Sequence, residues 1–206
     1  IGAKGGMIMQ RKAKVGSYMK TPKTDEISVA KYYRKHDPYY GLASTKHYRR
    51  TYIRGVLEDQ PYKHRVAIIY GQNPVGGSAG AQDVIQALKK LELVVDVTPF
   101  WSETNMYADV ILPECTFMER DEAIRPKWKT PYPTIAVHRK AVEPLYESQS
   151  GHWIFNELAR KTLTAEEYEQ YYGDYDRRGI QSIWEKQLAG VKASADELLT
   201  FSPQKL

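Results

Sequence analysis

Two polar segments have residue types that could bind a ligand, and the first is the glycine-rich stretch at residues 71–78. It follows an apolar run at residues 66–70 and precedes a stretch with helical periodicity, where backbone N–H groups can receive an anion. A P-loop needs Lys and then Ser or Thr after its last glycine, whereas Gly76 is followed by Gly77 and Ser78. The spacing also differs from the Gly-x-Gly-x-x-Gly dinucleotide fingerprint. A ligand-binding loop of another type and a plain strand-to-helix turn both stay open.

The second segment is the loop at residues 98–104, which follows another apolar run at residues 93–97. If both runs are neighbouring parallel strands, the two loops open on the same edge of one sheet, where ligands of such sheets bind. Together they offer Asn, Gln, Ser and Thr side chains. These groups suit the recognition of a polar ligand by hydrogen bonds and do not suit acid–base catalysis.

Other reactive side chains form no recognisable constellation. Asp109 and Glu119 lie ten residues apart, and we interpret them as charged loop edges rather than as a catalytic carboxylate pair. The five histidines are dispersed without metal-ligand spacing. Cys115, the only cysteine, has no histidine nearby and is interpreted as a small loop residue. One cysteine also excludes an internal disulfide and a cysteine-ligated cluster within this sequence.

The elements that must position these loops follow the pattern of an α/β sheet. Apolar, partly β-branched runs predict strands at residues 66–70, 93–97 and 109–112, the first of a kind covered on both faces. Apolar spacing predicts an amphipathic helix at about residues 84–91. A fourth strand is expected at residues 134–142, after a proline-containing loop at residues 125–133. Strand, helix and strand in this order predict parallel pairing with a right-handed crossover.

The last part of the sequence is predicted to be helical. Ser150 can cap a helix that buries Ile154, Phe155, Leu158 and Ala159. Thr164 with Glu167, and Ser194 with Glu197, match the spacing of capping boxes, and residues 180–191 keep helical periodicity.

The first sixty residues are basic and rich in tyrosine. The net charge of the chain is +5, but residues 1–60 hold 13 Lys and Arg against 5 Asp and Glu, while the rest holds 17 against 20. A helix is expected within them at about residues 44–58. This arm could bind nucleic acid through phosphate pairing and base stacking. The alternative that we favour is packing against another domain or subunit, because no nucleic-acid module signature accompanies the charge.

We therefore expect a basic arm at residues 1–60, an α/β domain at residues 61–163 and a helical extension at residues 164–206. No stretch approaches the length of an apolar membrane span, and no export signal opens the sequence. The first residue is Ile1, which favours a piece of a longer protein.

Three stretches of the sequence resemble the molybdopterin oxidoreductase family, the catalytic subunits related to dimethyl sulfoxide reductase. Residues 66–74 (VAIIYGQNP) resemble its strand ending in a Gly-x-Asn-Pro turn. Residues 93–119 (LVVDVTPFWSETNMYADVILPECTFME) resemble its next strand, loop and Ala-Asp-Val-x-Leu-Pro strand, and residues 1–6 (IGAKGG) resemble the segment before this region. The polysulfide and thiosulfate reductase branch is the more similar one.

The resemblance implies a parallel-sheet, dinucleotide-binding-like domain, the second of two that grip molybdenum or tungsten carried by two pyranopterin guanine dinucleotides. By position, Gln72, Asn73 and Thr98 would meet the guanosine part, and Arg120 stands where the family often has Lys near phosphate or pterin. The full set of expected cofactor-binding residues is Gly71, Gln72, Asn73, Thr98, Ser102, Thr104 and Arg120. Two departures stand out: Thr98 and Gly151 replace Asp residues that are common in the family.

The resemblance also implies what the rest of the enzyme would supply. The cysteines of a [4Fe-4S] cluster and the side chain that ligates the metal belong to an upstream part, so this chain alone is expected to be inactive. The whole enzyme would reduce a sulfur oxyanion, polysulfide or similar small inorganic substrate. Expected partners are the remainder of the catalytic subunit, an iron–sulfur subunit and a membrane anchor subunit. The compartment stays open, with an exported, membrane-associated parent enzyme as one alternative. A nucleic-acid-binding module and a stand-alone mononucleotide-binding domain are the alternatives.

Overall fold

The computed structural model describes residues 29–36, 48–127 and 134–189. By their contacts these residues divide into two compact units. The first, which we call the sheet unit, contains the described residues of ranges 22–116 and 145–151. The second, which we call the hairpin unit, contains those of ranges 117–144 and 152–206.

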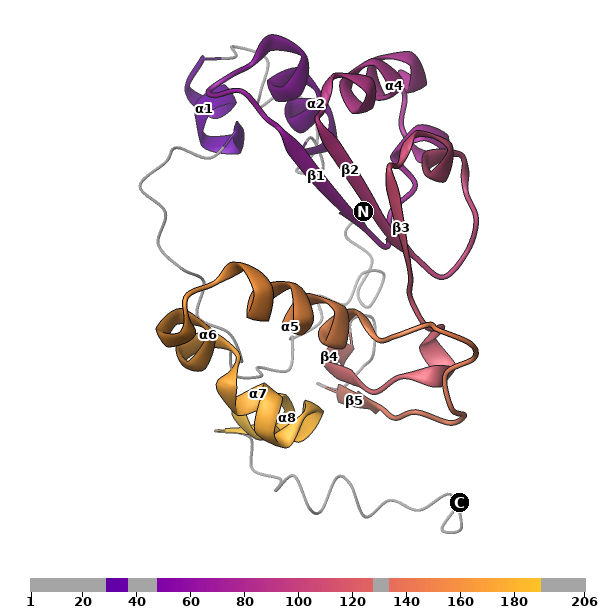
Figure 1. The fold of residues 1–206 in the computed structure, drawn as a ribbon, viewed down its shortest axis with the longest axis vertical. Coiled ribbons are helices and arrows are strands. Elements are labelled where there is room, and N and C mark those ends of the chain that lie inside the picture. Colours follow the sequence, from indigo (N-terminus) through magenta and orange to yellow (C-terminus); the bar gives the residue numbers. More distant parts are fainter. Residues whose placement is uncertain (1–28, 37–47, 128–133, 190–206) are drawn as a thin grey trace, which may run out of the picture. The chain divides into compact units, whose positions relative to one another are not determined.

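The sheet unit is built on three parallel strands in the order β1-β2-β3 (Figure 1). They are β1 (Val66–Tyr70), β2 (Leu93–Thr98) and β3 (Val110–Pro113). The three strands predicted from apolar runs, their parallel pairing and the α/β class are therefore confirmed, with ends shifted by one residue at β2 and β3. The helical elements of this unit are α1 (Val29–His36), α2 (Tyr48–Glu58), α3 (Pro74–Gly77), α4 (Ala81–Lys90) and the 3-10 helix η1 (Glu103–Tyr107).

One face of this sheet packs against helices. Val94 on β2 belongs to the same buried cluster as Val75 of α3 and Val84 and Leu88 of α4, and Ile69 of β1 packs against it. Helix α4 has its apolar residues on one side, Asp83 in its first turn and two lysines in its last, which is the arrangement that the helix dipole favours. The helices between β1 and β2 thus cover these two strands on one face of the sheet.

The described part of the basic arm packs inside the sheet unit. Helix α2 begins at Tyr48, and the predicted residues 44–47 lie outside the described ranges. Tyr33 of α1 is buried, and its hydroxyl donates a hydrogen bond of 2.6 Å to Glu58 of α2. Burial and this hydrogen bond raise the pKa of Tyr33 above its ordinary value. At least this tyrosine of the arm is used for packing within the same chain.

The hairpin unit corrects the prediction for residues 122–142. Strands β4 (Glu122–Lys127) and β5 (Thr134–His138) pair antiparallel in a separate two-stranded sheet, so β5 does not join the parallel sheet and ends at residue 138. Residues 125–127, expected in a loop because of Pro126, belong to β4. A two-stranded sheet has only edge strands, and an edge strand tolerates a proline because one of its sides needs no ladder hydrogen bonds.

Helices complete the hairpin unit. They are the 3-10 helix η2 (Phe117–Glu119), α5 (Gly151–Thr162), α6 (Ala165–Tyr171), α7 (Gly173–Arg178) and α8 (Ile180–Leu188), of which α5 begins on the last residue of the sheet unit. The predicted capping box of Thr164 and Glu167 is present at α6, and Ile154 and Ala159 of α5 are buried as expected. Residues 191, 194 and 197 lie outside the described ranges. β4 and β5 fall in one unit with the C-terminal helices because they pack against α8.

Candidate nucleotide-binding edge of the parallel sheet

The carboxyl ends of β1 and β2 lie side by side, which brings six of the seven predicted site residues to one edge of the sheet. Tyr70 and Val97 are partners in the register of the two strands, and the Gly71 N–H donates a 3.2 Å hydrogen bond to the Val97 carbonyl. Gln72 and Asn73 continue from β1, while Thr98 ends β2. We call this region, with Ser102 and Thr104, the candidate edge.

Asn73 ties the two loops of the candidate edge together. Its Oδ1 accepts hydrogen bonds from the Gly76 N–H at 3.0 Å and from the Thr104 hydroxyl at 2.7 Å. Its Nδ2 donates to Oε2 of Glu103 at 2.7 Å. One amide side chain therefore fixes its own turn and the second loop, in which Glu103 lies thirty residues further along the chain.

Close approach of the two loops requires a glycine at position 76. A Cβ atom built there would lie 2.6 Å from Asn73 Nδ2 and 2.7 Å from Glu103 Oε2, which no ordinary contact allows. Thr104 Oγ1 also accepts a 3.2 Å hydrogen bond from the Val75 N–H, so both loops share buried polar contacts. Gly76, one of the glycines that rule out a P-loop, thus has a packing role.

Glu103 is an exposed carboxylate at this edge that the sequence prediction left out of the site. The hydrogen bond from Asn73, and one from its own backbone N–H, lower the pKa of Glu103. The side chain therefore stays ionised near neutral pH and can only accept hydrogen bonds. Glu103 thus adds an exposed hydrogen-bond acceptor to the candidate edge.

The remaining predicted residues of the second loop shape its backbone. The Thr98 hydroxyl donates a 3.0 Å hydrogen bond to the Phe100 carbonyl, which turns the chain at the end of β2. Phe100 and Trp101 follow with their side chains about three-quarters exposed, at 70% and 75%. The candidate edge therefore presents aromatic faces beside its polar groups.

A chain of hydrogen bonds that runs from Ser102 to Asp96 in β2 stabilises this loop. The Ser102 N–H donates to Asn105 Oδ1 at 2.5 Å, and Asn105 Nδ2 donates to Oδ2 of Asp96 at 3.0 Å. Asp96 lies fully buried in β2, and burial raises the pKa of its carboxyl group. Sequence reasoning missed both Asn105 and Asp96, although Ser102 and Asn105 have capping-box spacing and Asp96 interrupts an apolar run.

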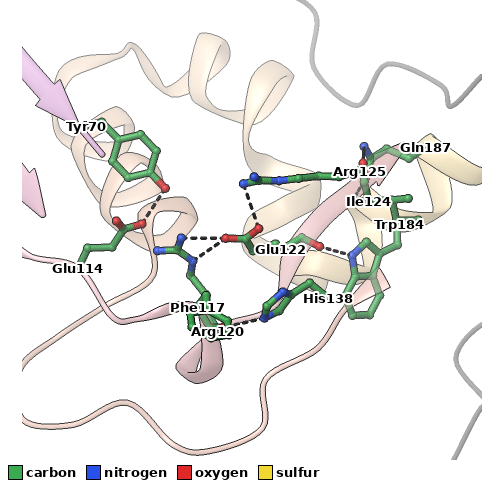
Figure 2. Close-up of polar contacts among 10 residues, drawn as sticks. All are labelled: Tyr70, Glu114, Phe117, Arg120, Glu122, Ile124, Arg125, His138, Trp184 and Gln187. Carbon is green, nitrogen blue, oxygen red and sulfur yellow. Dashed lines mark hydrogen bonds and ion pairs between the residues drawn. The ribbon is translucent and has the colours of Figure 1, made fainter. Parts of the chain in front are cut away.

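Tyr70 and Glu114 form a second missed pair at the same edge. The Tyr70 hydroxyl donates a 2.7 Å hydrogen bond to Oε1 of Glu114, which is buried just after β3 (Figure 2). A Cβ atom at Gly151 would clash with that hydroxyl. Gly151, noted above as a departure from the family pattern, is therefore the residue that leaves room for Tyr70.

Arg120 belongs to the hairpin unit. Its Nε and Nη2 donate to Oε1 of Glu122 at 2.9 and 2.8 Å, and Arg125 lies 3.0 Å from the other oxygen of Glu122 (Figure 2). Although burial alone would raise the pKa of Glu122, the hydrogen bond from Arg120 and the charge of Arg125 lower it. Arg120 is thus oriented by an ionised carboxylate, and its predicted place beside the other six residues stays a prediction.

Metal-binding clusters and membrane-spanning helices are both absent from the described residues. Within residues 29–36, 48–127 and 134–189, no three His, Cys, Asp or Glu side chains gather closely enough to hold a metal ion. None of the helices in these ranges has the length and apolar character needed to cross a bilayer.

Comparison with known proteins gives consistent matches. The family model described as molybdopterin oxidoreductase matches residues 13–161. The thiosulfate reductase molybdopterin-containing subunit PhsA of Salmonella typhimurium is 32% identical over 146 residues, which are 71% of this chain and 18% of that protein. A trimethylamine-N-oxide reductase of Pasteurella multocida is 33% identical over 108 residues, 52% of this chain and 13% of that protein.

Among solved structures, the acetylene hydratase of Pelobacter acetylenicus has a similar fold, with a TM-score of 0.59. The match covers 72% of this chain and 19% of that one, at 21% sequence identity. The chain therefore spans less than a fifth of the length of each of these relatives.

Proposed function

Because the chain belongs to the molybdopterin oxidoreductase family, we propose that its candidate edge binds the guanosine part of a pyranopterin guanine dinucleotide within a larger reductase. That larger protein is called the parent enzyme below. Family membership implies a molybdenum pterin cofactor. The guanine dinucleotide form, and the assignment of its guanosine to this edge, are the proposal.

One observation supports the proposal most strongly, namely the link that Asn73 makes between the two strand-end loops. Ligands of open parallel sheets bind outside the carboxyl ends of the strands. Here that position holds a turn and a loop whose geometry is fixed by the hydrogen bond that Asn73 donates to Glu103 and the one that it accepts from Thr104. A site that is rigid before the ligand arrives loses less conformational entropy on binding.

The residues present fit a nucleoside. Its ribose hydroxyls and the N–H groups of its base are donors, and the ionised Glu103 is an exposed acceptor held in place at this edge. Exposed aromatic rings such as Trp101 can stack on a base. When bound, the cofactor would supply the electron-transferring metal, and the residues of this chain would bind and orient its nucleoside end.

For the parent enzyme, we propose reduction of a small inorganic sulfur compound such as a sulfur oxyanion or polysulfide. The similarity to a thiosulfate reductase subunit over 71% of the chain supports this class. The trimethylamine-N-oxide reductases make N-oxides the competing class. We further propose that the partners are the remainder of the catalytic subunit, an iron–sulfur subunit and a membrane anchor subunit.

The test is substitution of Asn73 by alanine in the parent enzyme. We expect Asn73→Ala to lower the guanine nucleotide bound per enzyme by about half, because this edge would hold one of the two dinucleotides and its loops lose the side chain that joins them. The measurement is the GMP released by acid hydrolysis of the purified protein, together with its molybdenum and tungsten content.

Asn156→Ala is the matched control. Like Asn73, Asn156 is a hydrogen-bonded asparagine, but it is buried and lies in the hairpin unit beside Tyr168 and Asp176. Its substitution should leave the GMP content equal to that of the unmodified parent enzyme. Full GMP occupancy in Asn73→Ala would remove the candidate edge from the binding site, and a parent enzyme without molybdenum, tungsten or pterin would refute the proposed function.

A further inference from the structure

The second face of the parallel sheet exposes an apolar surface in the sheet unit. In the register of the strands, Val66 pairs with Leu93, and Ile68 pairs with Val95, which in turn pairs with Val110. These side chains point away from the cluster formed with α3 and α4, because residues in register share a face and alternate along a strand. We call this surface the open face.

Exposure on the open face is high for side chains of this type. Val66, Ile68, Tyr70 and Val110 are 51%, 48%, 42% and 41% exposed, whereas Ala67 and Val94 on the other face are buried. Val97, the register partner of Tyr70, is fully buried at the carboxyl end of the same face, so the exposed part is the one around Val66, Ile68 and Val110. Parallel sheets are almost always covered by helices on both faces. The apolar run of β1 has the composition of a doubly covered strand, but the described residues leave Val66 and Ile68 on its second face exposed.

The area of the open face limits what can cover it. Three strands of four to six residues, spaced about 4.8 Å apart and rising about 3.3 Å per residue, give a face of roughly 250 Å². A stable complex between separate chains buries about 800 Å² per partner. The open face alone is therefore smaller than the surface that a stable complex of separate chains uses, and it suits a segment that is covalently joined and so present at high effective concentration.

We propose that the open face packs against an amphipathic helix from the part of the parent polypeptide outside the matched region. This rests on the proposed function, since it takes the chain to be part of a longer catalytic polypeptide. The matched region is 18% of the thiosulfate reductase subunit, which leaves ample chain to supply such a helix. The helix would present aliphatic residues at i, i+3, i+4 and i+7 to Ile68 and its neighbours.

Thiol labelling at one position tests the proposal. Ile68→Cys and Ala67→Cys are made in the 206-residue chain and in the parent enzyme, and maleimide modification at each position is followed by peptide mass spectrometry. Ala67 is the control because it is adjacent in sequence and faces the buried side. In the 206-residue chain we expect the thiol at position 68 to react at least about tenfold faster than the control thiol at position 67. In the parent enzyme the two rates should become similar.

Three outcomes would overturn the proposal. Fast labelling at position 68 in the parent enzyme would show that the face stays in water. Slow labelling in the 206-residue chain at every concentration would show that this chain covers the face itself. Slow labelling only at high concentration would identify a second copy. A chain that fails to fold would reveal itself through fast labelling of the Ala67→Cys control.

A second variant keeps the test decisive in that case. Ile68→Lys in the parent enzyme should lower the midpoint of thermal unfolding by several degrees relative to Gln82→Lys, which adds the same charge at an exposed position of α4. Equal midpoints would refute the proposal. Neither the labelling nor the thermal unfolding needs the cofactor. Protection of position 68 in a parent protein without pterin would therefore contradict the proposed function and leave the packing of the open face supported.

Discussion

At the scale of single residues, the candidate edge depends on polar side chains that are buried or held by neighbours. Asn73 and Thr104 join two loops, and Glu103 is kept ionised by the hydrogen bonds that it accepts. Asp96 is different, because it is fully buried in β2 and its Oδ1 has no hydrogen-bond partner among the described residues. A buried carboxylate with one free oxygen is unfavourable, which is why burial favours its protonated form.

Asp96 should therefore make the stability of the sheet unit depend on pH. Burial raises the pKa of the Asp96 carboxyl in the folded state above the unfolded value of about 3.9. The contribution of the protonated carboxyl to folding stability is therefore fully present below the unfolded pKa and is lost as the pH rises through the folded-state pKa. Asp96→Asn keeps the shape and removes the titration. Relative to wild type, the variant should gain about 1.4 kcal/mol between pH 4 and pH 7 for each unit by which the pKa is raised.

Denaturant unfolding of both proteins at several pH values measures this difference. Parallel stability curves for wild type and Asp96→Asn would show that Asp96 does not titrate differently in the folded state. Asp121→Asn is the control, because this carboxylate lies in the hairpin unit at an exposed hydrogen bond to the Lys140 N–H.

At the scale of elements, side chains of α8 form hydrogen bonds with the backbone of β4 in the hairpin unit. Gln187 of α8 accepts a 2.7 Å hydrogen bond from the Ile124 N–H and donates one of 3.0 Å to the Ile124 carbonyl. Trp184 Nε1 donates to the Glu122 carbonyl at 2.8 Å (Figure 2). Among the described residues β4 pairs with one strand, and these contacts satisfy the backbone groups of Ile124 and the carbonyl of Glu122.

Loss of the Gln187 side chain should destabilise this unit. Gln187→Ala leaves the buried N–H and C=O of Ile124 without partners, and each unsatisfied group costs about 1–3 kcal/mol. We therefore expect a loss of about 2 kcal/mol or more in urea unfolding. Gln170→Ala on the exposed side of α6 is the control and should change the stability by less than about 0.5 kcal/mol. A similar small effect for Gln187→Ala would mean that water replaces both hydrogen bonds.

At the scale of the whole molecule, the chain is a fraction of the relatives that it matches. The matched region covers 18% of the thiosulfate reductase subunit and 19% of acetylene hydratase. Cys115 is the only cysteine and is buried, so it cannot supply the ligands of a [4Fe-4S] cluster. The binding of one end of a cofactor is a role that this chain can have without the remainder.

The 206-residue chain by itself should therefore have no reductase activity. An anaerobic assay with a reduced viologen dye as electron donor and thiosulfate or trimethylamine N-oxide as acceptor measures it, with the parent enzyme as the positive control. Turnover by the isolated chain would show that it holds a complete catalytic centre and would contradict the proposed division of labour.

Local patterns in the sequence determined the three parallel strands, the crossover helix α4, the capping box of α6 and the loops at the sheet edge. Each depends on periodicity or on residues a few positions apart, which neighbours in the chain enforce directly. The family resemblance, based on residues 66–74 and 93–119, was confirmed by the family match.

Contacts between distant residues were decided by the tertiary structure alone. Asn73 meets Glu103 and Thr104 across thirty residues, and β4 is held by α8 across more than sixty. The antiparallel pairing of β4 with β5, the accommodation of Tyr70 by Gly151 and the exposure of one sheet face are of the same kind. No local pattern encodes them, because they arise when separate elements pack and each buried polar group has to find its hydrogen-bond partner.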